Sequence, residues 1–81
     1  MNTIMASESD IKKAFQSGDD DGDDTLSVSE ASTALEKLCG KSVDESTVEA
    51  ACRKCGVDTK REMDFDEFVS LVRHLEDNGE L

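Results

Sequence analysis

The sequence predicts an all-α protein built from two similar helix–loop–helix units. Apolar residues recur at helical spacing in four segments, and the chain contains no proline that would interrupt a helix. The second half also repeats the first, because the pattern L-S-x-x-E at 26–30 is answered by M-D-x-x-E at 63–67, 37 residues later. With 81 residues, the chain has the length of one small domain, for which a core alone provides marginal stability.

The first unit is expected over about residues 8–40. The sequence S-E-S-D at 7–10 can cap a helix over about 8–16, whose inner face carries Ile11, Ala14 and Phe15. A second capping box, S-V-S-E at 27–30, opens a helix that runs to about Cys39. Its inner stripe consists of Val28, Ala31, Leu35 and Leu38. Gly40 is a natural stop for this helix.

The second unit is expected over about residues 44–78, after a short linker. A third helix starts near Asp44 or Glu45 and ends at Gly56. A fourth helix starts at Phe65 and ends at Asn78-Gly79. The predicted inner residues of these two helices are Val48, Ala51, Cys52 and Cys55, then Phe65, Phe68, Leu71, Val72 and Leu75.

The segment 19–30, D-D-D-G-D-D-T-L-S-V-S-E, is the most informative part of the chain. It holds six of the 20 acidic residues and no basic one, so an ordered fold around it needs a counter-charge. Oxygen ligands from positions 1, 3, 5, 7 and 9 and a bidentate glutamate at position 12 are the pattern with which a twelve-residue loop binds Ca²⁺. The corresponding ligands are Asp19, Asp21, Asp23, the carbonyl of Thr25, Ser27 through a water molecule, and Glu30.

This loop resembles the calcium loop of the EF-hand superfamily, and the resemblance extends over about residues 8–77. The chain is similar to a small calcium-binding protein with a single EF-hand pair, comparable to one half of a calmodulin-like protein. The family usually has glycine at loop position 6, whereas this chain has Asp24, which would need a left-handed backbone there. A register with Gly22 at position 6 would replace both end ligands by Ser17 and Val28, and we therefore reject it.

The resemblance also implies how the two loops meet and where the chain departs from the family. In EF-hand pairs a short two-stranded antiparallel bridge joins the eighth loop positions, which places Leu26 beside Met63. Gly18 stands just before the first ligand, where the family often has an aromatic residue. We expect this glycine to remove some core and to loosen the start of the loop.

The second loop, 56–67, is a degenerate copy of the first. Its first position is Gly56, and Lys60 and Arg61 occupy positions 5 and 6. Only Asp58, Asp64 and Glu67 remain as oxygen ligands, with cationic side chains among them. We expect this loop to support the first one structurally rather than to bind a second Ca²⁺.

The cysteines and the single histidine allow two other readings. Cys52-x-x-Cys55 could be a redox pair, but such pairs normally sit at a helix N-terminus, and this one is expected in a last helical turn. A zinc site could recruit Cys39 and His74, although neither has a typical ligand spacing. A small core residue is the simpler interpretation of Cys52.

Composition excludes several classes of function. A net charge of −11 and a pI near 4.2 argue against nucleic acid and anionic membranes as partners. Neither a membrane-spanning run nor a signal peptide is recognisable, and the odd number of cysteines suggests reduced thiols, so we expect a cytoplasmic monomer. The sequence contains no catalytic arrangement, and we do not expect an enzyme.

The leading hypothesis is a small cytosolic Ca²⁺ sensor or buffer with one working site, at which Mg²⁺ would be a competitor. Calcium sensors of this family expose a methionine-rich groove, and this chain has only Met1, Met5 and Met63. The alternative is an interaction module, similar to a light chain, that binds a target helix without calcium. Its signature would be an apolar cleft between the second and third helices that persists without metal.

Overall fold

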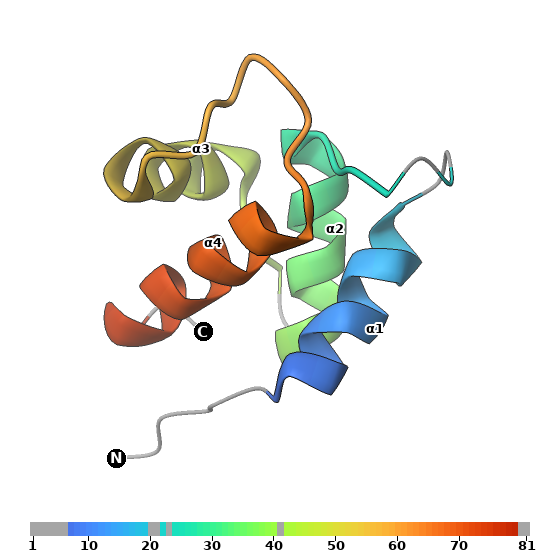
Figure 1. The fold of residues 1–81 in the computed structure, drawn as a ribbon. Coiled ribbons are helices and arrows are strands. Elements are labelled where there is room, and N and C mark those ends of the chain that lie inside the picture. The colour runs from blue at the N-terminus through green and yellow to red at the C-terminus, as the bar shows by residue number, and fades with distance from the viewer. Residues whose placement is uncertain (1–6, 20–21, 23, 41, 80–81) are drawn as a thin grey trace.

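The computed structural model describes residues 7–19, 22, 24–40 and 42–79, which form four α-helices and no strand. In chain order these are α1 (Glu8–Gly18), α2 (Val28–Cys39), α3 (Glu45–Cys55) and α4 (Phe65–Asp77). In Figure 1, α1 and α2 run side by side, and α3 and α4 form the other half of the molecule. No helix in the described part of the chain is long and apolar enough to cross a membrane. The prediction of an all-α protein with four helices is confirmed.

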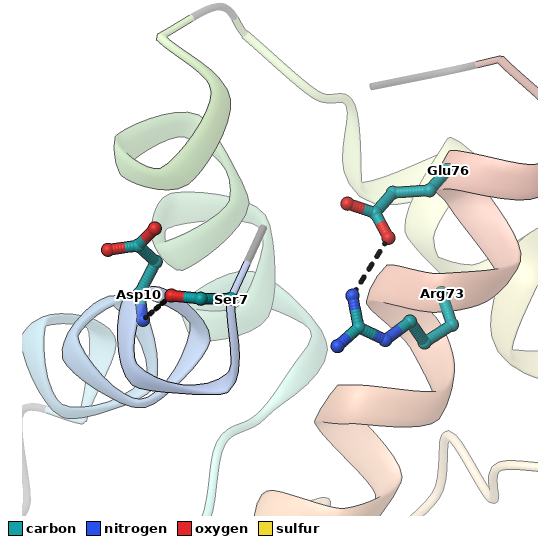
Figure 2. Close-up of polar contacts among 4 residues, drawn as sticks. All are labelled: Ser7, Asp10, Arg73 and Glu76. Atoms are coloured by element: carbon teal, nitrogen blue, oxygen red, sulfur yellow. Dashed lines mark hydrogen bonds and ion pairs between the residues drawn. The ribbon is translucent and has the colours of Figure 1, made fainter. Parts of the chain in front are cut away.

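Side-chain caps fix where most of the helices begin. Ser7 caps α1, and its hydroxyl oxygen accepts a hydrogen bond from the amide of Asp10 at 3.1 Å (Figure 2). Both α2 and α4 begin with a complete capping box, from Ser27 to Glu30 and from Asp64 to Glu67, so the two units share the same local structure. Helix α3 follows Asp44, whose side chain makes no capping hydrogen bond.

The helix ends match the expected stops, with one exception. Gly40 and Gly56 follow α2 and α3 with positive φ values of 76° and 83°, as expected for glycine after a helix. Helix α1 continues two residues beyond the predicted end, to Gly18.

The core is one cluster to which all four helices contribute. Helix α1 packs on α2 and α3 on α4, and contacts of α2 with α3 and of α1 with α4 join the two units. Phe15 of α1 forms an edge-to-face ring pair with Phe65 of α4 at 5.5 Å, and its ring also lies 5.6 Å from that of Phe68. The predicted inner residues are buried, except that Val28, Leu38, Cys55 and Phe65 are only partly buried against the core.

One buried carboxylate lies at the end of α4. The side chain of Glu76 is 4% exposed, and its Oε1 accepts a hydrogen bond from Nη1 of Arg73 at 3.1 Å (Figure 2). The pair sits on successive turns of the same helix and compensates the charge of Glu76 where it is removed from water.

The loops that precede α2 and α4 meet at an isolated antiparallel bridge between Leu26 and Met63. The amide of Leu26 donates to the Met63 carbonyl at 2.8 Å, and the amide of Met63 donates to the Leu26 carbonyl at 2.7 Å. Both side chains are buried, at 0% and 1% exposure. The predicted pairing of these two residues is therefore present, as a single bridge rather than as two strands.

The expectation that Gly18 removes some core is wrong. This residue is buried and belongs to the last turn of α1, where it faces the first turns of α2. A Cβ at this position would lie 2.8 Å from the carbonyl oxygen of Glu30 and 2.9 Å from the Cβ of Ala34. Gly18 does not leave a gap in the core, because the missing side chain lets the two helices approach closely. The expected looseness at the start of the loop stays a prediction.

Candidate metal site

Asp19 organises the first half of the loop 19–30. Both oxygens of its carboxylate accept hydrogen bonds from main-chain amides, Oδ1 from Gly22 at 3.0 Å and Oδ2 from Asp24 at 2.9 Å. Such bonds turn the chain back over the end of α1, where Asp19 is the C-terminal cap. They also leave the carboxylate half-exposed, so that its remaining lone pairs can accept another partner.

Asp24 has the left-handed backbone that its position in the loop requires. Its φ is 64°, and it is the only non-glycine residue with positive φ in the described part of the chain. Aspartate is one of the few residues that visit this region, at a cost of about 1–2 kcal/mol. The turn is therefore formed without glycine at position 6, as the chosen register predicted.

Glu30 and Ser27 close the other end of the loop. The amide of Ser27 donates to Oε1 of Glu30 at 2.9 Å, and the amide of Glu30 donates to Oγ of Ser27 at 3.2 Å. Both residues are partly exposed. The Glu30 carboxylate lies at the N-terminus of α2, where the helix dipole favours a negative charge.

Thr25 connects the loop to the second unit through its side chain. Its hydroxyl donates a hydrogen bond to Oε1 of Glu62, a residue that lies directly before the bridge residue Met63. Glu62 is not among the site residues predicted from the sequence. The internal repeat offered a signal, because Thr25 and Glu62 are both position 7 of their loops and both precede a bridge residue.

Four of the six predicted ligands lie in the part of the chain that the structure describes, namely Asp19, Thr25, Ser27 and Glu30. Asp21 and Asp23 lie outside the described residues. Among the residues that are described, no group of three or more His, Cys, Asp or Glu side chains could hold a metal ion. The donors that are present are all oxygens, which is the chemistry that suits a hard cation such as Ca²⁺ or Mg²⁺.

Three acidic residues of loop 56–67 accept hydrogen bonds from main-chain amides of the same loop. Oδ1 of Asp58 accepts from the amide of Lys60 at 2.8 Å, and the carboxylates of Asp64 and Glu67 both accept within the capping box of α4. Lys60 and Arg61 are exposed beside them. A turn and a helix start account for these three carboxylates, and the loop brings two cationic side chains to the same place.

The cysteines have the character of core and helix-end residues. Cys52 is fully buried, and burial, followed by the nearby charges of Cys55, Glu67 and Glu49, raises the pKa of its thiol to about 11. Sγ of Cys55 donates a weak hydrogen bond to the carbonyl of Cys52 at 3.7 Å. A thiol that stays protonated at neutral pH is a poor nucleophile, so Cys52 lacks the property that a redox pair needs.

Comparisons of the chain with protein-family models, with curated proteins and with solved structures found no match. A function must therefore be inferred from the residues and the geometry of this chain. Loop 19–30 has an oxygen-rich sequence, and the amides of Gly22 and Asp24 in it donate to Asp19.

Proposed function

We propose that the chain binds one Ca²⁺ through loop 19–30 and acts as a small calcium sensor or buffer of the EF-hand type. The observation that carries this proposal is the turn at Asp24. Twelve-residue calcium loops turn sharply at position 6, and the left-handed backbone of Asp24 at this position supports such a turn. The amide of Asp24 also donates to the carboxylate of Asp19, the residue at position 1. The ligands would be Asp19, Asp21, Asp23, Thr25, Ser27 and Glu30.

Several features of the chain support this function. The loop lies between two helices that pack on each other, and a bridge between Leu26 and Met63 pairs it with a second loop of the same pattern. The repeated capping boxes, with Glu30 and Glu67 at equivalent positions, are further support for an EF-hand pair. A divalent cation would offset the mutual repulsion of the carboxylates in the loop.

The role of each protein group follows from its place in the loop. Asp19 ends α1 and presents a carboxylate that is already oriented by two amides. Thr25 offers a main-chain carbonyl next to the bridge, and Ser27 offers its hydroxyl through a water molecule. Glu30 would supply two carboxylate oxygens in place of its bond to the Ser27 amide, so cation binding and capping of α2 would share one side chain.

A strong and promiscuous target groove is not part of this proposal. Met63 is 1% exposed and belongs to the core, while Met1 and Met5 lie outside the described residues. A methionine-rich surface of the kind that calmodulin-like sensors use thus gains no support from Met63. We infer a buffer or a sensor with few partners, and no enzymatic activity.

Titration of the full chain with calcium by calorimetry tests the proposal. We expect one Ca²⁺ per chain, and Glu30→Gln should remove most of the affinity because it removes the bidentate ligand. Glu67→Gln is the matched control, because Glu67 has the same capping role in the other unit. Its stoichiometry should stay at one. A wild-type chain that binds no calcium would contradict the function, and a stoichiometry of two would contradict a silent second loop.

One observation favours a calcium-independent interaction module as the second candidate. A hollow of about 250 Å³ lies between α1, α4 and the first loop and is lined by Lys12, Phe15, Gln16, Asp24 and Phe65. It lies between α1 and α4, whereas the cleft predicted from the sequence would lie between the second and third helices. Binding of the dye ANS, measured with calcium and with a chelator, separates the two candidates. Strong dye binding that is equal in both conditions would favour the interaction module.

A further inference from the structure

The two loops are connected by a side chain as well as by the bridge. The Thr25 hydroxyl of the first loop donates to Oε1 of Glu62 in the second. One residue further along each loop, Leu26 and Met63 exchange two main-chain hydrogen bonds. We propose that Glu62, although it belongs to the degenerate loop, is a positioning residue that sets the cation affinity of loop 19–30. This inference rests on the proposed function.

The direction of the Thr25 carbonyl follows from the bridge. A trans peptide unit is planar, so the carbonyl of Thr25 points opposite to the amide of Leu26. The Leu26 amide points toward loop 56–67, because it donates to the Met63 carbonyl at 2.8 Å. The Thr25 carbonyl therefore points away from the second loop, toward the side on which its own loop would hold the cation.

The hydrogen bond to Glu62 restrains the conformation of the Thr25 side chain. The bridge fixes the peptide unit that follows Thr25, and the bond to Glu62 keeps the side chain on the side of the second loop. Rotation of the Thr25 backbone would break this bond. Thr25 is only partly buried and Glu62 is exposed, so packing alone does not hold this part of the loop in place.

This restraint affects the calcium affinity because it raises the fraction of molecules whose loop has the binding-competent conformation. When only a fraction of the molecules has the competent conformation, the apparent dissociation constant rises by the inverse of that fraction. Carboxylates that repel each other favour other conformations of the cation-free loop. A hydrogen bond worth about 1 kcal/mol corresponds to about a fivefold change in the competent population.

A double-mutant cycle on the full chain separates this role from simple charge attraction. Glu62→Ala removes both the charge and the acceptor, whereas Thr25→Val removes the hydroxyl that donates to Glu62 and keeps the β-branched shape. We expect each single variant to raise the calcium Kd about fivefold. The double variant should be little weaker than Glu62→Ala alone, because either substitution already breaks the bond. Glu62→Gln, which keeps an acceptor oxygen, should recover part of the loss.

A second measurement does not depend on the cation. Amide hydrogen exchange in the presence of a chelator should become faster at Leu26 in Glu62→Ala and in Thr25→Val. Exchange at Val72, in the buried face of α4, should remain close to that of the wild type. An equal acceleration at both amides would indicate a general loss of stability and would contradict a positioning role.

The outcomes distinguish this inference from the function on which it rests. A wild-type chain that binds no calcium overturns both. A wild-type chain that binds one calcium, with single-variant effects that multiply in the double variant, overturns only the role of Glu62, because independent charge and hydroxyl effects would then explain the data.

Discussion

The α-carbon of Gly18 faces Ala34 so closely that a Cβ on Gly18 would lie 2.9 Å from the Cβ of Ala34. The carbonyl oxygen of Glu30 would be nearer still, at 2.8 Å. Contacts this short force one of the partners to move. Gly18 thereby determines how closely the end of α1 approaches the start of α2, and these are the two helices that flank the candidate metal loop.

We therefore predict that Gly18→Ala destabilises the protein. Overpacking of a close contact costs about 1–3 kcal/mol. Alanine stabilises a helix relative to glycine by at most about 1 kcal/mol, so the cost of overpacking should dominate. Chemical denaturation with a chelator present measures the difference. Ala34→Gly in the same chain should relieve only part of the cost, because the Glu30 carbonyl remains in place. A Gly18→Ala variant as stable as the wild type would contradict the close packing.

The helices of this protein could be predicted from local sequence. The spacing of Ile11, Leu35, Val48 and Leu71 predicted the buried faces, and the capping box at Ser27 and the glycine at position 40 marked helix boundaries. Each of these signals lies within a few residues of the structure that it predicts. The pairing of Leu26 with Met63, which no local signal contains, was implied by the resemblance to EF-hand pairs.

The structural features that could not be predicted from the sequence depend on contacts between distant segments. The role of Gly18 depends on Ala34 in another helix, and glycine in a sequence indicates equally a loose turn or a close approach. The bond from Thr25 to Glu62 depends on the placement of two loops and on side-chain rotamers. The predicted ligands Asp21 and Asp23 lie outside the described residues, so the site is characterised at its two ends.

Replacement of Asp24 by glycine should tighten calcium binding. Glycine adopts a φ of 64° without steric cost, and it keeps the amide that donates to Asp19. Relief of about 1–2 kcal/mol of strain in the bound loop would lower Kd by about 5- to 30-fold. Loss of one negative charge opposes this gain. Asp24→Asn isolates the charge effect, because asparagine also tolerates the left-handed region. Weaker binding by the glycine variant in calorimetry at physiological salt would show that the charge dominates.

The buried thiol of Cys52 predicts a loss of stability at alkaline pH. Its folded-state pKa is raised to about 11, so the folded protein keeps the proton after the unfolded chain has released it. The stabilising contribution is complete below the unfolded-state pKa of about 8.5, and it is lost as the pH rises toward 11. By pH 11 the loss should amount to about 3 kcal/mol.

Denaturation of wild type and Cys52→Ala at several pH values between 8 and 11 checks this prediction. The free energy of unfolding should fall more steeply with pH in the wild type, because the alanine variant has no thiol to ionise at this position. Other groups that titrate in the same range affect both proteins and cancel in the difference. Parallel curves would show that Cys52 ionises equally well in the folded and the unfolded chain.

Calcium should raise the melting temperature of the wild type substantially. A ligand that binds only the folded state at a hundredfold excess over its Kd adds about 2.7 kcal/mol. For a domain of this size, each kcal/mol corresponds to about 4–8 °C, so we expect an increase of about 10 °C or more in millimolar calcium. Monovalent salt should produce a smaller increase, because it only screens the repulsion among the carboxylates.

The same melting experiment decides between the two candidate functions. In Glu30→Gln the calcium-dependent increase should largely disappear, whereas Glu67→Gln should retain it. The helices should persist in part with a chelator, because Phe15, Leu35 and Phe68 belong to a core to which all four helices contribute. Identical melting curves of the wild type with calcium and with chelator would mean that the folded loop does not bind the cation. The second candidate function would then be favoured, with the hollow beside Phe15 and Phe65 as the binding site of a calcium-independent partner.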